Sequence, residues 1–108
     1  MNSQINPGAD ADLIERFLEM LAAERGVARN TLLAYRSDLA AASEMLAGKL
    51  AAASKDTLAI LTAGWSHLAN SSIARKAAAL RGFFGFLEEE GFRPDNPSAA
   101  LPRPVQSR

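Results

Sequence analysis

The side chains best suited to chemistry in this sequence are arginines that stand apart from carboxylates. Arg29, Leu33 and Arg36 follow one another at intervals of four and three residues, which places them on one side of a helix. Guanidinium groups aligned in this way can bind phosphates, because each carries a permanent charge and several N–H donors. The alternative is a solvated helix flank that binds nothing, which is the usual role of charged residues on a single helix.

A second basic segment lies in residues 70–82, where Arg75, Lys76 and Arg81 precede the acidic run 88–90. The same segment is rich in alanine and glycine, so one side of a helix here would carry little side-chain bulk. Glycine within a helix costs about 1 kcal/mol relative to alanine, and the close approach of a neighbour is a physical reason to keep it. That neighbour is either another helix or a sugar-phosphate backbone.

Groups that could perform catalysis or hold a metal are scarce. His67 is the only histidine, Tyr35 is the only tyrosine, and there is no cysteine. The sequence therefore offers no metal-binding cluster, and no acid, base and nucleophile that could meet. Tyr35 falls on the apolar side of its helix, where its ring is most simply part of the core. We expect no catalytic residue, no metal site and no cofactor; a free-standing enzyme would need an activity independent of any further domain.

The composition predicts an all-α domain to position these residues. The 108 residues suffice for one core, alanine and leucine dominate the hydrophobic share, and valine and isoleucine are few. Apolar residues at helical spacing predict four helices: residues 11–25, residues 29–47, one that follows Ser54 and one that ends before Gly91. Phe83 and Phe86 lie beside the main stripe of the last helix. This helix is therefore either central to the bundle or offers apolar surface to a partner.

Capping residues define the expected ends of these helices. The expected N-caps are Asp10, Ser54 and one of Asn70, Ser71 and Ser72, and the expected stops are Gly26, Gly48 and Gly91. Four prolines follow Gly91, which excludes a long helix there and predicts an extended exit that leads toward a further domain. We expect a flexible tail over residues 1–9, one domain over residues 10–98 and the start of a linker over residues 99–108.

The charge and hydropathy of the chain also limit the kinds of partner that it can have. The formal net charge is zero, which by itself argues against nucleic acid, but the acidic and basic residues are segregated along the chain. No apolar run approaches the roughly 20 residues that a membrane helix needs, and the N-terminus lacks the apolar core of a signal peptide. We therefore expect a cytoplasmic protein without membrane contact.

Together these segments resemble the N-terminal core-binding domain of tyrosine recombinases of the phage-integrase and Xer type. The matching segments are LIERFLEMLAAERGVA, NTLLAYRSDL, SSIARKAAALRGFFGFL and DNPSAAL, which span residues 12–101. The resemblance implies a four-helix bundle of the SAM-like type. It also implies that this bundle clamps one side of duplex DNA while a separate C-terminal domain clamps the other side.

The resemblance assigns roles to individual residues. In this family the second and fourth helices meet the major groove and the adjacent phosphates. The candidate DNA contacts implied by position are Thr31, Arg36, Arg75, Lys76 and Arg81, and helix geometry adds Arg29 and Leu33. The family's tyrosine nucleophile lies in the C-terminal domain, so Tyr35 is not expected to be catalytic and this chain is not expected to be an enzyme.

The resemblance also implies three partners. They are double-stranded DNA, the C-terminal catalytic domain of the same parent chain and other recombinase subunits on the DNA. We therefore predict the DNA-binding domain of a site-specific recombinase or integrase. The alternative from another class is a helical protein-interaction domain, in which the small-residue face of residues 74–85 receives a partner helix.

Overall fold

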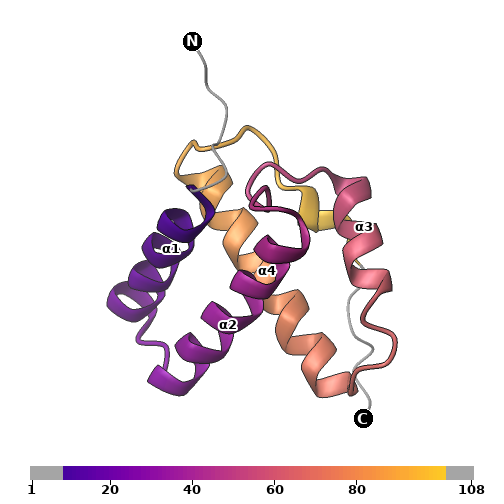
Figure 1. The fold of residues 1–108 in the computed structure, drawn as a ribbon. Helices are drawn as coiled ribbons and strands as arrows, with labels where there is room; N and C mark the ends of the chain where they lie inside the picture. Colours follow the sequence, from indigo (N-terminus) through magenta and orange to yellow (C-terminus); the bar gives the residue numbers. More distant parts are fainter. Residues whose placement is uncertain (1–8, 102–108) are drawn as a thin grey trace. The chain divides into compact units, whose positions relative to one another are not determined.

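The computed structural model describes residues 9–101, which fall into two compact units that divide between Ala53 and Ser54. The helices are α1 (Ala9–Arg25) and α2 (Arg29–Met45) in the first unit, and α3 (Lys55–Ala63), α4 (Asn70–Glu89) and the 3-10 helix η1 (Pro97–Ala100) in the second (Figure 1). The described residues contain four α-helices and no strand, so the predicted all-α class is confirmed. No helix among them is long and apolar enough to span a membrane.

The first unit is a hairpin of α1 and α2, which pack against each other. Gly26 has a φ of 60° and ends α1 as predicted, because glycine adopts this left-handed conformation without steric cost. α2 ends at Met45, two residues before the predicted end. The buried apolar residues of this unit are Leu13, Ile14, Phe17, Leu18, Leu21, Leu39, Ala42, Leu50, Ala51 and Ala53.

Asp10 is a structural anchor of the first unit. It lies within α1, since the helix begins at Ala9, and it is 2% exposed. Its carboxylate accepts hydrogen bonds from the backbone N–H groups of Leu50 at 2.8 Å and Ala51 at 3.0 Å, and from the Ser43 hydroxyl. The predicted role of Asp10 as an N-cap is therefore wrong. Its carboxylate instead ties the start of α1 to the segment that follows α2.

The helix ends of the second unit agree only in part with the prediction. Ser54 caps α3 as predicted, and its hydroxyl accepts a hydrogen bond from the Thr57 N–H at 3.1 Å. The predicted cap of α4 is wrong: Ala69 occupies the N-cap position without a side-chain hydrogen bond, and residues 70–72 lie inside the helix. Gly91 follows α4 with a φ of 81°, which fits the predicted stop.

α4 is buried on more than one side. Phe83 and Phe84 are both fully buried and contact each other edge to face, with 5.4 Å between their ring centroids. Phe86 is also buried, so the phenylalanines beside the main stripe belong to the core, which favours the first of the two predicted alternatives. The buried residues of α4 are Ala77, Ala79, Leu80, Phe83, Phe84, Phe86 and Leu87.

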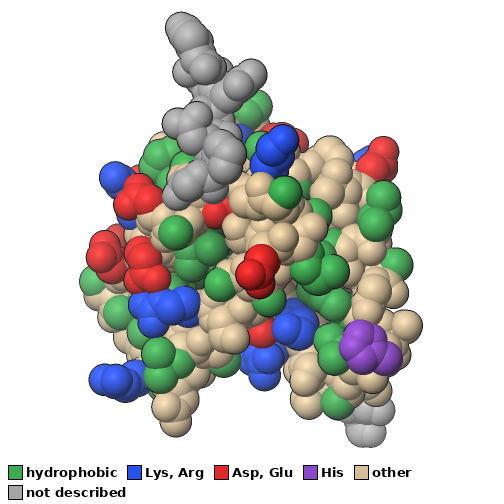
Figure 2. Space-filling model, viewed as in Figure 1, with side chains coloured by type: hydrophobic (Ala, Val, Ile, Leu, Met, Phe, Trp, Pro, Cys, Tyr) green, Lys and Arg blue, Asp and Glu red, His purple; other side chains and the backbone are tan. Residues whose placement is uncertain are grey.

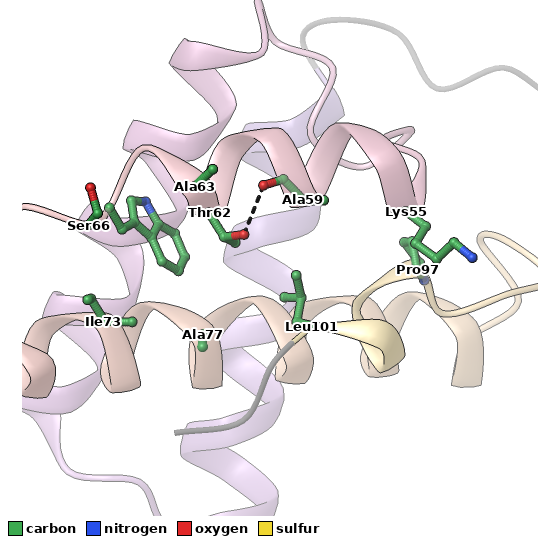
Figure 3. Close-up of a pocket in the computed structure, with 10 residues that line it drawn as sticks. Lys55, Ala59, Thr62, Ala63, Ser66, Ile73, Ala77, Pro97 and Leu101 are labelled. Carbon is green, nitrogen blue, oxygen red and sulfur yellow. Dashed lines mark hydrogen bonds between the residues drawn. The ribbon is translucent and has the colours of Figure 1, made fainter. Parts of the chain in front are cut away.

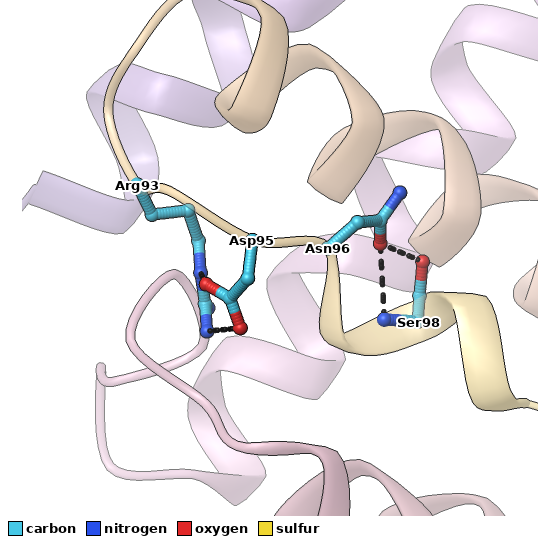
Figure 4. Close-up of polar contacts among 4 residues, drawn as sticks. All are labelled: Arg93, Asp95, Asn96 and Ser98. Carbon is cyan, nitrogen blue, oxygen red and sulfur yellow. Dashed lines mark hydrogen bonds and ion pairs between the residues drawn. The ribbon is translucent and has the colours of Figure 1, made fainter.

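Polar contacts within the segment after α4 order it (Figure 4), and Arg93 joins it to α4. The Arg93 guanidinium lies over the Phe84 ring, 5.4 Å from its centroid, and pairs with Asp95 at 3.0 Å. Asn96 caps η1, because its side-chain oxygen accepts hydrogen bonds from the Ser98 N–H at 3.0 Å and the Ser98 hydroxyl at 2.6 Å. The prolines exclude a long helix as predicted, but residues 97–100 form a 3-10 helix where an extended exit was expected.

η1 packs against both α3 and α4. Leu101, which follows it, is buried. The predicted flexible tail lies outside the described residues except for Ala9, which begins α1. Of the predicted linker, residues 102–108 also lie outside them.

Candidate nucleic-acid interface

Three of the predicted contact residues come together on α2. Arg29, Leu33 and Arg36 are exposed and line one surface hollow of about 350 Å³. Leu33 is 45% exposed, which is high for an apolar side chain. These three residues therefore lie on one side of α2, as their spacing of four and three residues predicts.

The opposite wall of this hollow is acidic. It is formed by α1 and includes Glu15 and Glu19. Figure 2 shows acidic side chains gathered over α1, with basic side chains next to them. Two arginines and two glutamates therefore share the hollow, so its charges balance.

An ion pair joins the two walls. Arg36 donates a hydrogen bond from Nε to Glu15 Oε2 and another from Nη2 to Glu15 Oε1, each 2.7 Å long. These hydrogen bonds, with the attraction of the guanidinium charge, hold the pKa of the Glu15 carboxyl below its ordinary value of 4.5. They also raise the pKa of Arg36 above its ordinary value. Both groups are about half exposed, so solvent screens the pair and its contribution to folding stability is small.

Thr31 does not join this cluster. It is exposed, but it follows Arg29 by two residues and therefore lies about 200° around the helix from it. It does not line the hollow. Any contact that Thr31 makes with DNA would use another side of α2.

The three basic candidates on α4 point in different directions. Lys76 lies about 100° and Arg81 about 240° around the helix from Arg75. Arg75 is exposed, whereas Lys76 and Arg81 are partly buried. The Arg81 Nη1 atom is buried and has no hydrogen-bond partner among the described residues. α4 therefore does not present these side chains as one basic face.

The small-residue side of α4 is less tightly packed than expected at Gly85. A Cβ atom at this residue would lie 3.8 Å from the Asn96 side-chain nitrogen, which is an ordinary van der Waals distance. A methyl group would therefore fit, and packing within this unit does not require glycine at Gly85.

The second unit contains an apolar hollow of about 440 Å³ between α3, α4 and the segment after α4 (Figure 3). Ile73 and Ala77 form its α4 side, and Leu101 points between the two helices. Thr62 and Ala59 also line the hollow, and the Thr62 hydroxyl donates a hydrogen bond to the Ala59 carbonyl at 3.1 Å. The remaining lining residues are Lys55, Ala63, Trp65, Ser66 and Pro97.

No metal-binding cluster appears in the part of the chain that the structure describes. Within residues 9–101, no three histidine or carboxylate side chains gather closely enough to hold a metal ion. His67 is exposed in the connection between α3 and α4. Tyr35, which was expected in the core, is partly buried.

Three residues have roles that the sequence analysis did not predict. Glu15 pairs with Arg36 across 21 residues, Asp10 bonds backbone groups 40 and 41 residues away, and Arg93 covers the Phe84 ring. The only sequence signal for the Glu15 pair is the acidic character of residues 10–24, which precede the basic segment. That signal does not say which carboxylate meets which arginine.

Comparison with known proteins assigns the sequence of this chain to a family. Residues 14–91 match the model of the phage integrase N-terminal SAM-like domain. The tyrosine recombinase XerC of Erythrobacter litoralis (strain HTCC2594) is 60% identical over 95 residues, which cover 88% of this chain and 31% of the relative. The tyrosine recombinase XerD of Brucella suis biovar 1 (strain 1330) is 47% identical over 100 residues, which cover 88% of this chain and 32% of the relative.

A third relative agrees with these two. The tyrosine recombinase XerD of Rhizobium meliloti (strain 1021) is 41% identical over 103 residues, covering 91% of this chain and 33% of the relative. The chain therefore spans about a third of the length of these relatives. No solved structure matches the chain. The matched residues include parts of all four α-helices, and the chain belongs to the phage integrase N-terminal SAM-like domain family, as its sequence motifs predict.

Proposed function

We propose that this chain is the DNA-binding domain of a site-specific tyrosine recombinase and binds one side of duplex DNA at the recombination site. The observation that carries the proposal is the exposed cluster of Arg29, Leu33 and Arg36 on α2 in a member of this family. The domain would comprise residues 10–98, followed by a linker.

The proposed mechanism is electrostatic positioning on phosphates. Arg36 on α2 and Arg75, Lys76 and Arg81 on α4 would contact the backbone, and Thr31 would add a polar contact from α2. Base readout would be limited to side chains of these two helices that reach a groove. With so few phosphate contacts, binding would be weak and would fall as salt rises, by about 0.9 in log-log slope for each neutralised phosphate.

The relatives suggest the wider context of this domain. They are named tyrosine recombinases and are about three times as long as this chain. We infer that catalysis belongs to a C-terminal domain of the parent protein and that the present chain is not itself an enzyme. Its partners would be double-stranded DNA, that catalytic domain and other recombinase subunits. A site-specific recombinase of this kind would act in the cytoplasm.

The proposal is tested by substituting arginines and measuring duplex binding by fluorescence anisotropy from low to high salt. Arg75→Ala should weaken binding several-fold at low salt and reduce the salt slope by about 0.9, and Arg36→Ala should change both quantities in the same direction. Arg16→Ala is the matched control, because Arg16 carries the same charge but lies on α1, paired with Asp12 at 3.0 Å. Unchanged affinity and slope in both test variants would reject the proposal.

A second candidate function is protein–protein interaction. The second unit favours it, because Ile60 on α3 is 76% exposed and the apolar hollow lies beside the same helix. This function predicts self-association that depends on protein concentration and that duplex DNA does not change. Sedimentation velocity with and without DNA would distinguish the two functions.

A further inference from the structure

We propose that Glu15 competes with DNA phosphate for Arg36 and thereby limits how strongly the exposed face of α2 holds DNA. This inference rests on the proposed DNA-binding function. It assigns to an acidic residue of α1 a role in tuning the affinity of the neighbouring helix.

The geometry of the ion pair supports this role. Glu15 occupies two donors of Arg36, Nε and Nη2, through two bonds of 2.7 Å. These donors form an edge of the guanidinium that can hold a phosphate with two parallel hydrogen bonds. A phosphate at this edge must displace the Glu15 carboxylate, and a phosphate at the remaining N–H groups must approach beside it.

The electrostatics act in the same direction. A paired carboxylate cancels the charge of Arg36 at the distance of a phosphate contact, so less counterion release is gained when DNA binds. Arg29 lines the same hollow but makes no ion pair within residues 9–101, so it is the α2 arginine whose charge is not already matched. The acidic wall therefore weakens one arginine of the cluster more than the other.

The pair is not expected to be needed for folding. The Arg36 and Glu15 side chains are 45% and 49% exposed, and exposed ion pairs contribute little to stability. Glu15→Gln keeps the shape and helix preference of the side chain while removing its charge. This variant is therefore expected to fold as the parent chain does, which circular dichroism would verify.

Glu19→Gln is a matched control, because Glu19 lies one turn further along α1 and lines the same hollow without pairing with Arg36. Both variants would be measured in the 108-residue chain, with and without Arg36→Gln, using a labelled generic duplex across a salt series. We expect Glu15→Gln to tighten binding about 3- to 10-fold at low salt and to steepen the salt slope by at most about 0.9, the contribution of one neutralised phosphate. Glu19→Gln should have a smaller effect, and Arg36→Gln should abolish the gain from Glu15→Gln.

The possible outcomes separate the two proposals. Weaker binding by Glu15→Gln would mean that Glu15 orients Arg36 toward DNA, and would overturn the competition. Equal gains from Glu15→Gln and Glu19→Gln would also overturn it, because net charge alone would explain them. In both cases salt-dependent binding by the parent chain would leave the DNA-binding function standing. If neither the parent chain nor any variant binds duplex DNA, the proposed function fails and the competition fails with it.

Discussion

α2 and α4 are the two helices expected to meet DNA, and they are built differently. α2 buries Asp38, Leu39 and Ala42 and keeps its clustered arginines on an exposed side. α4 buries seven residues, including three phenylalanines, and two of its three basic candidates are partly buried. A surface can change its contacts without disturbing the fold only where it is separate from the core. The arginines of α2 meet this condition, and so does Arg75 on α4, whereas substitutions of Lys76 and Arg81 are expected to affect folding as well as binding.

The units that carry these helices also differ in what holds them together. In the first unit a buried carboxylate bonds two backbone N–H groups across the hairpin. In the second unit aromatic rings pack in the core and an arginine covers one of them. Substitutions in each unit can test this contrast between a polar anchor and an aromatic core.

The largest effect is expected in the aromatic core. Phe84→Ala would remove a fully buried ring that contacts Phe83 and Arg93, and should lower the free energy of unfolding by about 3–5 kcal/mol. Chemical denaturation followed by circular dichroism measures this loss. Phe92→Ala is the control and should cost clearly less, because Phe92 is 40% exposed. Equal losses would show that the second unit does not depend on the ring of Phe84.

The polar anchor of the first unit should give the next largest effect. Asp10→Ala leaves the N–H groups of Leu50 and Ala51 without their side-chain acceptor, and should cost about 2–4 kcal/mol in the same measurement. Asp12→Ala is the matched control, since it removes an exposed pair with Arg16 and a carboxylate in the first turn of α1, and should cost less than about 1 kcal/mol. If the two variants unfold alike, the anchor contributes nothing and the contrast between the units is lost.

A glycine substitution in α4 should raise the free energy of unfolding, whereas the two preceding substitutions should lower it. Gly85→Ala should stabilise the chain by up to about 1 kcal/mol, because alanine is the better helix former and its methyl group has room. Gly91→Ala should destabilise it by about 1 kcal/mol, because Gly91 has a φ of 81°. Thermal melts of both variants test the two signs. Destabilisation by Gly85→Ala would mean that α4 needs a close approach at this residue after all.

The smallest effect is expected from acid at the exposed pair beside α2. The pKa of Glu15 is lowered in the folded chain, so its stabilising contribution is present above about pH 4.5 and is lost as the pH falls through the lower folded value. Glu15→Gln should therefore lack this part of the acid sensitivity. The difference in stability between the parent chain and the variant should shrink as the pH falls below 4.5. A difference that is constant with pH would show that the pair does not form in solution.

Much of the fold could be predicted from local sequence. Gly26 and Gly91 ended their helices, and Ser54 capped α3, because each of these roles depends on the residue and its immediate neighbours. The predicted cap of α4 failed because Ala69 has the extended geometry of the N-cap position, which places residues 70–72 in the first turn of the helix. The capping preferences of individual residues cannot decide whether a helix begins at one residue or at its neighbour.

The candidate site was predicted less completely than the fold. The helical period brought Arg29, Leu33 and Arg36 together, but the same period spreads Arg75, Lys76 and Arg81 around α4. The resemblance to the family supplied these last three residues. Whether they contact DNA is a prediction that the arginine variants test.

The sequence by itself determined the helical class, the face shared by the α2 arginines and the family, because these follow from residue type and short-range spacing. Only the tertiary structure decided that Asp10 anchors a loop 40 residues away, that Glu15 pairs with Arg36 and that Arg93 covers Phe84. Each of these contacts joins segments separated along the chain. The packing of helices and loops decides which residues meet in these contacts, and a local sequence pattern does not predict that packing.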